Sequence, residues 1–265
     1  MVCYLKFAIC VALALLPSSI KVPLYRLLFG YRIGRGVRIG LSPLFGVGRC
    51  RIGDHARIGS FNLFYQVGDL EIGDHAQIGF LNFFRGGRKV RIGAYASILR
   101  QNVFNSIIKR DFVDPVDPVL DLGAGATVTS GHWLDFSAGI GIGDHTIVGG
   151  RNSSFWTHNR QRGRPIAVGC HCYLGSEIRV APGAEVPKFC IVALGSVLAG
   201  QFWPPRSLIG GNPASVAREL QERDLVLIIH KTRDDIPDDL AQMHLPEDLL
   251  EIARQPDGIM YSCPV

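Results

Sequence analysis

The sequence predicts an all-β fold in which short strands wind into a three-sided prism. Aliphatic residues recur every six positions, the recurrences fall in units of about twenty residues, and 31 of the 265 residues are Gly. The units read "IGRGVRIG", "IGDHARIG", "IGDHAQIG", "IGAYASIL", "LGAGATVT" and "IGDHTIVG" and begin at 33, 52, 72, 92, 122 and 142. A period of six matches neither a helix nor a long alternating strand, but it matches a short strand followed by a corner.

The repeat also predicts which side chains point into the prism. A second aliphatic residue follows the first by six positions, and the same step continues to residue 198. We expect these residues to face inward: Ile39, Ile58, Ile78, Ile98, Val128, Val148, Val168, Leu174, Val180, Val186, Val192 and Leu198. Small residues suit the narrow corners: Ala56, Ala76, Ala96, Ala126, Thr146 and Ala184. The expected divisions are a segment at 1–32, a repeat domain at 33–207 and a tail at 208–265.

Composition narrows the class of protein. Apolar residues make up 47% and charged residues 19%, which is typical of a folded chain. The net charge of +5 is too mild to imply a nucleic-acid binder, but it suits anionic small molecules or a lipid surface. Seven Cys without a C-x-x-C spacing indicate free thiols and a cytoplasmic protein. A zinc site at Cys170, His171 and Cys172 would lack a fourth ligand at a recognisable spacing.

The amino-terminal segment leaves two interpretations open. Its apolar run, Phe7 to Leu16, is ten residues long, whereas a membrane-spanning helix needs about twenty. A secretory signal is not favoured, because Lys6 is the only basic residue before the run. The stretch "IKVPLYRLLFGYR" intersperses basic and large apolar residues, as an interfacial segment does. Residues 1–32 therefore either cap the prism or make peripheral contact with the inner face of a membrane.

Two long stretches interrupt the repeat, and loops on a rigid scaffold are where function concentrates. Residues 100–121 carry two Asp-Pro pairs and either cover a substrate or a neighbouring subunit or form a tolerated surface insertion. Residues 153–165, "SSFWTHNRQRGRP", present one histidine, two aromatic residues and three arginines. The tail after 220 has no repeat; "PEDLLEIARQ" predicts a short helix, and we expect the tail to cover the open edge of the last coil.

Residues 33–200 resemble the hexapeptide-repeat acyltransferases, and "LIGGNPASVAREL" at 208–220 is similar to their exit segment, a turn leading into a short helix. The resemblance implies a left-handed parallel β-helix and a homotrimer with sites between subunits. It also implies transfer of an acetyl group from acetyl-CoA to a sugar hydroxyl. The apolar amino terminus and the arginine loop favour a lipid-linked or polysaccharide-building sugar, and hence polysaccharide or glycolipid biosynthesis. The acceptor would be a small or lipid-linked sugar.

The resemblance assigns catalytic roles to two residues. His158 matches the family's catalytic base, because a neutral imidazole takes a hydroxyl proton at neutral pH and returns it to the departing thiolate. The backbone N–H of Ser176 matches the donor that stabilises the oxyanion.

Further residues are implied as binding contacts. The implied acceptor contacts are His132, Asp135, Trp156, Asn159 and Tyr173. The implied coenzyme contacts are Gly175, Ala193, Gly195, Ala199, Asn212, Pro213, Arg160 and Arg164. The sequence departs from the family at Tyr173, which replaces a common Trp, at Leu194, which replaces a small residue, and at Ala199 and Gly200, which replace a Thr-Lys pair. The loop arginines, Arg162 included, either hold a phosphate or form a solvated face.

Three other functions remain as alternatives. His55, His75 and His145 occupy the same repeat position, which predicts solvent-facing corners; the sharper alternative is a zinc site like that of the related carbonic anhydrases. Their spacing over distant coils argues against it, so we expect no metal. The other two alternatives are an N-acyltransferase acting on an amino sugar and a β-helix scaffold without catalysis.

Overall fold

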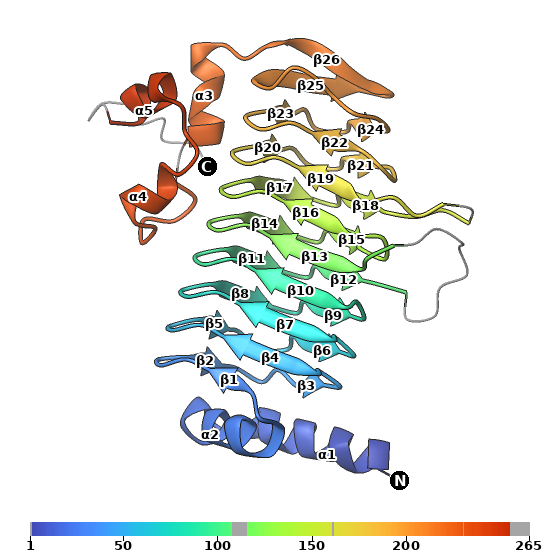
Figure 1. Ribbon diagram of the computed structural model, residues 1–265, viewed down its shortest axis with the longest axis vertical. Coiled ribbons are helices and arrows are strands. Elements are labelled where there is room, and N and C mark those ends of the chain that lie inside the picture. The colour runs from blue at the N-terminus through green and yellow to red at the C-terminus, as the bar shows by residue number, and fades with distance from the viewer. Residues whose placement is uncertain (1, 108–115, 161, 230, 255–265) are drawn as a thin grey trace.

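The computed structural model describes residues 2–107, 116–160, 162–229 and 231–254, and side chains from residue 8 onward. It is a prism of three parallel sheets (Figure 1), as the repeat predicts. We name the sheets A, B and C. The chain passes from A to B to C in each coil, so the prism has an A–B, a B–C and a C–A corner.

Sheet A contains β1 (Arg32–Ile33), β4 (Arg49–Ile52), β7 (Asp69–Ile72), β10 (Lys89–Ile92), β13 (Val119–Leu122), β16 (Ile140–Ile142), β19 (Ile166–Val168) and β22 (Glu185–Val186). Sheet B contains β2 (Arg38–Ile39), β5 (Arg57–Ile58), β8 (Gln77–Phe80), β11 (Ser97–Arg100), β14 (Thr127–Ser130), β17 (Ile147–Arg151), β20 (Tyr173–Leu174), β23 (Ile191–Val192), β25 (Ser207–Gly211) and β26 (Ala214–Glu219). Sheet C contains β3 (Leu44–Phe45), β6 (Leu63–Tyr65), β9 (Phe83–Arg85), β12 (Val103–Asn105), β15 (Trp133–Asp135), β18 (Ser154–Trp156), β21 (Arg179–Val180) and β24 (Val197–Leu198).

The inward-facing side chains form continuous columns. On sheet A, Ile33 pairs in register with Ile52 and Ile52 with Ile72, and all three are buried. On sheet C, the rings of Phe64, Phe84 and Phe104 stack at 4.6 Å intervals. The twelve inward residues predicted from the six-residue step are all buried. Equivalent residues therefore pack on one another from coil to coil, which fixes the register of every sheet.

A buried asparagine ladder at the B–C corner was not foreseen. Asn62, Asn82 and Asn102 are at most 1% exposed. The side-chain amide of Asn82 donates to Asn62 Oδ1 at 2.9 Å and to the Leu99 carbonyl at 3.2 Å. Its Oδ1 accepts the backbone N–H of Asn102 at 3.0 Å. The ladder satisfies polar backbone groups that the tight corner would otherwise bury without partners.

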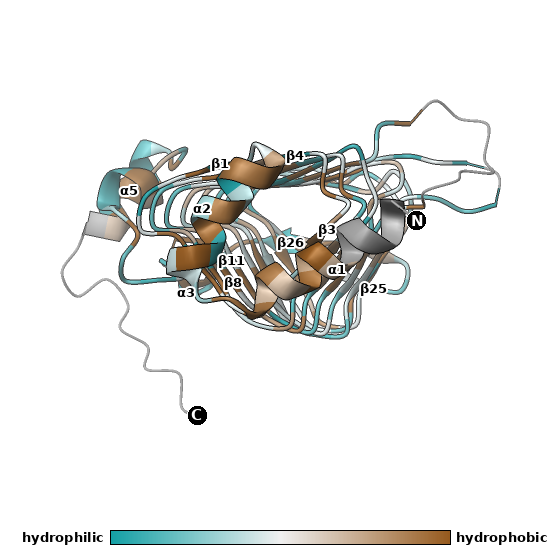
Figure 2. Cartoon of the chain, turned by 90° about the horizontal axis from the view of Figure 1, so that it is seen from below, coloured by the Kyte–Doolittle hydropathy of each residue, from teal (hydrophilic) through white to brown (hydrophobic). Residues whose placement is uncertain are grey.

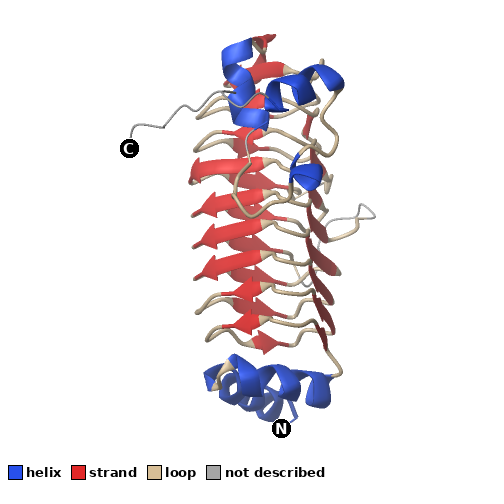
Figure 3. Ribbon diagram, turned by 90° about the vertical axis from the view of Figure 1, so that its left-hand side faces the viewer, coloured by secondary structure: helices blue, strands red, loops and turns tan. Residues whose placement is uncertain are grey.

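Two helices cover the first coil, as the cap interpretation predicts (Figures 1 and 3). They are α1 (Val2–Leu15) and α2 (Ser18–Phe29). Leu13, Val22 and Tyr25 join the core of the prism. The buried Lys21 ammonium donates to the carbonyls of Ala14 and Gly40, both at 2.7 Å, and so ties both helices to the first coil. None of the described helices has the length and apolarity needed to cross a bilayer.

The first interruption is shorter than predicted. Residues 100–105 remain in the prism, because β11 ends at Arg100 and β12 spans Val103–Asn105. Phe104 lies six positions after Ile98 and is fully buried, so an aromatic residue continues the repeat that a search for aliphatic residues misses. β13 resumes at Val119, so the break is confined to 106–118, of which 108–115 lie outside the described residues.

The tail also differs from the prediction. The Asn212–Pro213 turn joins β25 to the antiparallel β26, so the expected helix directly after the turn is wrong. Helix α3 (Glu222–Ile229) follows, with α4 (Asp238–Ala241) and α5 (Glu247–Arg254), and α5 confirms the short acidic-start helix. The tail packs beside the last coil, as expected, because Ile228 and Leu249 cluster with Phe189 and Ile191. It turns back along the A–B corner, where Arg233 Nη1 donates to the His75 and Tyr95 carbonyls at 3.1 and 3.2 Å (Figures 1 and 3).

We predict that Asn82→Ala lowers the free energy of unfolding by about 2–4 kcal/mol, because it leaves the Asn102 N–H and the Leu99 carbonyl buried without partners. Thermal denaturation followed by circular dichroism measures the effect. The matched control is Gln77→Ala on the outer face of sheet B, which should cost less than about 0.5 kcal/mol. Equal melting temperatures for the two variants would show that the ladder contributes nothing.

Candidate functional site

Both interruptions of the repeat leave the prism at the C–A corner. The break at 106–118 joins β12 to β13, and the loop at 157–165 joins β18 to β19 (Figure 1). One ordinary coil, β15 to β16, lies between them. A hollow of about 340 Å³ separates the two, lined by Val116, Asp117, Gly139, Gly163 and Pro165 among others. The sequence therefore gathers its irregular segments on one edge of the prism.

The second loop is a short hairpin that presents His158. Its base is held by Thr157, whose hydroxyl donates to the Asp135 carbonyl at 2.8 Å and whose carbonyl accepts the Arg164 N–H at 2.8 Å. At its tip, Asn159 Oδ1 accepts the Arg162 N–H at 2.9 Å. Asn159, implied as an acceptor contact, thus also shapes the turn. Hydrogen bonds anchor the loop to the prism on both sides of His158, so the backbone that carries the imidazole is held in place.

His158 lies against a buried carboxylate. Its Nε2 is 3.4 Å from Asp135 Oδ1, and the Asp135 side chain is 2% exposed, whereas the imidazole is 18% exposed. The same carboxylate oxygen accepts the Ser137 N–H at 3.1 Å. A carboxylate at Nε2 favours the tautomer with the proton on Nε2 and stabilises the imidazolium form of the ring. The sequence implied an acceptor contact for Asp135, but the structure places it beside the histidine.

The carboxylate ends a hydrogen-bonded row on the outer face of sheet C. Arg85 Nη1 donates to Asn105 Oδ1 at 3.0 Å, and Asn105 Nδ2 donates to Asp135 Oδ2 at 2.9 Å. The three residues are register partners on β9, β12 and β15. Sequence analysis missed Arg85 and Asn105, because their meeting depends on two unequal coil lengths, 20 and 30 residues. Only the correct pairing of β12 with β15 across the first interruption would have predicted their contact.

Two exposed tryptophans flank this row. Trp156 is in register with Asp135, and its ring stacks on Trp133 at a centroid distance of 6.0 Å and an interplanar angle of 24°. Both indoles are about two-fifths exposed. Trp156 was implied as an acceptor contact, whereas Trp133 was not singled out. Together they form an aromatic platform beside the His158–Asp135 pair.

His132 lies under the surface. It is 1% exposed; its Nε2 is 2.9 Å from Thr129 Oγ1, and its Nδ1 accepts the Ser153 N–H at 3.2 Å. Burial lowers its pKa to about 4, so the ring is neutral at physiological pH. In this chain both nitrogens are engaged by the protein, which leaves none for the acceptor contact that the resemblance implies. Its observed contacts tie β14 to the residue before β18.

Ser176 lies at a different corner from His158. It follows β20, so it belongs to the B–C corner, whereas His158 belongs to the C–A corner. Gly150 of the neighbouring coil packs beside it, and a Cβ there would approach Ser176 Oγ to 1.6 Å. One copy of the chain therefore does not bring the predicted base and the predicted oxyanion donor together.

The implied coenzyme contacts divide between the same two corners. Gly175, Ala193 and Gly195 lie with Ser176 along the B–C corner, and the Asn212–Pro213 turn follows β25 of sheet B. Arg160, Arg164 and Ala199 lie along the C–A corner, where the Arg164 side chain packs over Gly183.

Tyr173 and the corner histidines contact the tail or one another. Tyr173 is half-buried and packs against a second apolar cluster that includes residues of α3 and α5, so part of its ring contacts the tail. His55 stacks on His75 at 5.1 Å, and His145 on His171 at 5.0 Å. The prediction of solvent-facing corners is wrong for His145, which is 7% exposed, because the tail runs over this part of the corner.

Two groups of residues were considered as metal sites: the three corner histidines, and His171 with its two neighbouring cysteines. In the described part of the chain neither group is arranged as a metal centre. No group of three or more His, Cys, Asp or Glu among the described residues could hold a metal ion. His171, between the two cysteines considered as ligands, has its nitrogens 3.0 and 2.7 Å from the carbonyls of Ile228 and Met243.

Comparison with known proteins finds short matches to curated proteins named as putative acetyltransferases. No model of a protein family matches the chain. Over 60 residues it is 30% identical to "Putative acetyltransferase YJL218W" of Saccharomyces cerevisiae, covering 23% of this chain and 30% of that protein. Over 67 residues it is 33% identical to "Putative acetyltransferase SACOL2570" of Staphylococcus aureus, covering 24% and 33%. The matches span about a third of the length of these curated relatives.

Two of the solved structures that the chain matches are an O-acetyltransferase and a hexapeptide-repeat acetyltransferase by name. The polysialic acid O-acetyltransferase OatWY is 15% identical, covers 71% of this chain and 84% of its own, and has a TM-score of 0.42. VCA0836 of Vibrio cholerae, complexed with acetyl coenzyme A, is 18% identical, covers 79% and 84%, and has a TM-score of 0.35. Repeat and prism together define this chain as a hexapeptide-repeat β-helix protein.

We predict that buried histidines make the fold sensitive to acid. Burial lowers the pKa of His145 to about 4. Because the unfolded chain takes up this proton below about pH 6.5, stability present above that pH is lost as the pH falls towards 4, by about 3 kcal/mol for this group. His145→Asn, which tolerates the φ of 55°, should therefore lose less melting temperature between pH 7 and pH 4.5 than the unsubstituted protein does.

The control is His55→Asn, at the exposed corner with nearly the same φ, 57°. It should keep the pH dependence of the unsubstituted protein. The same pH dependence in His145→Asn would contradict the assignment.

Proposed function

We propose that this protein is an acyltransferase that moves an acetyl group from acetyl-CoA to a sugar hydroxyl in polysaccharide or glycolipid biosynthesis. The observation that carries the proposal is the His158–Asp135 pair, a partly exposed imidazole against a buried carboxylate on a rigid edge. The family resemblance of the repeat and the names of the curated relatives support the same reaction class. A cytoplasmic location, expected from the cysteine pattern, belongs to the proposal.

The reaction proceeds by direct transfer. His158 takes the proton from the acceptor hydroxyl as the hydroxyl oxygen attacks the thioester carbonyl, and Asp135 stabilises the imidazolium that results. The carbon–oxygen bond forms, the carbon–sulfur bond breaks, and the proton passes from His158 to the departing thiolate. The products are the acetyl ester and free coenzyme A, so no covalent enzyme intermediate is needed.

The complete site needs a second copy of the chain. The Ser176 N–H is the proposed oxyanion donor, and it lies at the B–C corner, whereas His158 lies at the C–A corner. A homotrimer in which the C–A corner of one copy faces the B–C corner of the next unites the two. Cyclic symmetry then produces three equivalent sites.

The coenzyme is proposed to bind between these facing corners. Gly175, Ala193 and Gly195 allow close approach of the pantetheine arm along the B–C corner, and the loop arginines Arg160 and Arg164 approach it from the other side. Guanidinium groups bind phosphate well, so they supply the charge that the missing lysine would have given.

The acceptor is proposed to rest on the aromatic platform of Trp133 and Trp156. Flat, exposed indole faces are suited to pack against the apolar face of a sugar ring while the hydroxyl rim stays polar. Asp135 lies in register beside Trp156, so a sugar on the platform has its hydroxyls near His158. An amino sugar would fit the same platform; product analysis therefore separates O- from N-acetylation.

We predict that His158→Asn lowers kcat/KM for acetyl transfer by about 10²–10⁴-fold, because it removes the base. The assay follows coenzyme A release with a panel of free and lipid-linked sugars. His244→Asn is a matched control, because His244 Nε2 lies 3.0 Å from Asp144 Oδ2 in a second His–Asp pair away from the site.

Full activity of His158→Asn in a folded protein would refute the assignment. An unsubstituted protein that neither binds acetyl-CoA nor releases coenzyme A would favour the non-catalytic scaffold.

We also predict graded effects along the row behind His158. Asp135→Asn removes the charge beside the imidazole and should lower kcat more than Asn105→Ala, which loosens the carboxylate without removing it. KM for acetyl-CoA should change little in either variant, because neither residue touches the proposed coenzyme site. Steady-state kinetics over a range of pH measures both. A larger effect from Asn105→Ala than from Asp135→Asn would contradict the row as the support of His158.

A further inference from the structure

The positive charge of the chain is concentrated at its capped end. Asp54 is the first acidic residue in the sequence, so all 23 acidic residues lie from there onward. Eight basic residues precede it: Lys6, Lys21, Arg26, Arg32, Arg35, Arg38, Arg49 and Arg51. The net charge of +5 is therefore unevenly distributed: residues 1–53 are strongly positive, and the rest of the chain is slightly negative.

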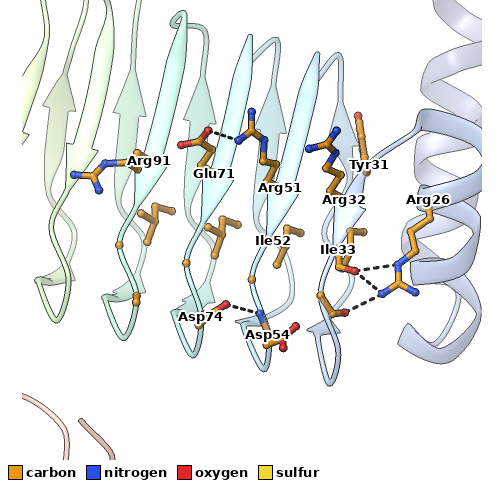
Figure 4. A pocket seen from close by; sticks show the side chains of 17 residues that line it. Arg26, Tyr31, Arg32, Ile33, Arg51, Ile52, Asp54, Glu71, Asp74 and Arg91 are labelled. Atoms are coloured by element: carbon orange, nitrogen blue, oxygen red, sulfur yellow. Dashed lines mark hydrogen bonds and ion pairs between the residues drawn. The ribbon is translucent and has the colours of Figure 1, made fainter. Parts of the chain in front are cut away.

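Several of these charges have no acidic partner. Arg35, Arg49 and Arg51 pair with Asp54, Asp69 and Glu71 of the next coil. Lys21 and Arg26 donate to backbone carbonyls and form no ion pair among the described residues. Figure 4 shows the contacts of Arg26. Arg32 and Arg38 are exposed and form no ion pair within the described residues.

The register of the first two coils adds repulsion. Arg32 is paired directly with Arg51 on sheet A, and Arg38 with Arg57 on sheet B. Like charges on neighbouring strands are destabilising. Figure 4 shows Arg32 and Arg51 side by side near the helical cap.

The cap beside these arginines is apolar on its outside. The two helices carry a set of exposed aliphatic side chains: Ile9, Val11, Leu15, Ile20, Leu27 and Leu28. Leu27 is 79% exposed and Leu15 is 69% exposed, although each lies in a helix that also contributes to the core. Ile9 of α1 and Leu28 of α2 line the same hollow, so the apolar surface is continuous across the two helices. Figure 2 looks onto this end, where the hydrophobic colour of α1 and α2 is extensive.

We propose that α1, α2 and the first coil form a docking surface for an anionic lipid bilayer. The exposed aliphatic side chains enter the acyl boundary, and Arg32 and Arg38 lie at the level of the headgroups, where each contributes electrostatic attraction. An anionic bilayer has an apolar interior beneath a negatively charged surface. This arrangement matches the exposed aliphatic side chains of the cap and the arginines of the first coil. The cap of a second copy fits poorly, because it would bring two strongly positive ends together.

This surface is separate from the proposed catalytic site. The cap covers the first coil, whereas His158 belongs to the coil of β18, five strands farther along sheet C. The proposal therefore does not depend on the proposed function, and the two are tested independently.

Vesicle sedimentation with the full chain tests the docking surface. The protein is mixed with vesicles of phosphatidylcholine alone or of phosphatidylcholine with phosphatidylglycerol. We expect partition to the anionic vesicles only, decreasing as salt is raised. Leu15→Gln and Leu27→Gln should each weaken partition about tenfold, and Arg32→Gln and Arg38→Gln about fivefold each. His158→Asn should bind vesicles as the unsubstituted protein does.

Matched controls lie at the other end of the prism. Leu194→Gln changes a leucine that is 76% exposed, and Arg223→Gln an exposed arginine of α3; neither should alter partition. Equal binding to neutral and anionic vesicles, or no binding to either, would overturn the proposal. Self-association that Leu27→Gln abolishes, without vesicle binding, would instead identify a second copy as the occupant.

Discussion

The structure depends on one constraint: each short strand must hydrogen-bond to the equivalent strand of the next coil while its inward side chain packs on an equivalent one. Ile33, Ile52 and Ile72 meet this constraint on sheet A, and Phe64, Phe84 and Phe104 meet it on sheet C. Because every coil satisfies it in the same way, the scaffold is rigid and nearly featureless. Chemistry must therefore come from the places where the chain leaves the repeat, and both breaks lie on one edge.

The same constraint explains what sequence could and could not predict. A residue that points inward recurs every six positions, so the prism, its core and its corners were readable without a structure. Phe104 was misjudged because an aromatic ring replaces an aliphatic one at an inward position. The row from Arg85 to Asp135 was out of reach, since its members are 20 and 30 residues apart and meet only through register. The tail has no sequence repeat, so its course along the A–B corner could not be predicted from the sequence.

The proposed docking surface and the proposed catalytic site lie at different heights along the prism. Successive coils are about 4.8 Å apart, so five coil steps place His158 about 24 Å above the capped end. A protein docked through α1 and α2 would hold its base at that height over the bilayer. A lipid-linked acceptor would then need to present its sugar at this distance from the surface, whereas a free sugar would meet no such limit. The length of the prism thus links the proposed docking surface to the proposed acceptor.

We propose that His158 and Ser176 act together from different copies of the chain. Mixing two inactive variants tests it directly: His158→Asn lacks the base, and Ser176→Pro lacks the backbone donor, with folding and assembly of each verified beforehand. If each site takes one residue from each of two neighbours, random reassembly of equal amounts should restore about a quarter of the full activity. If both residues act from the same chain, every site in the mixture carries a defect, and no activity returns.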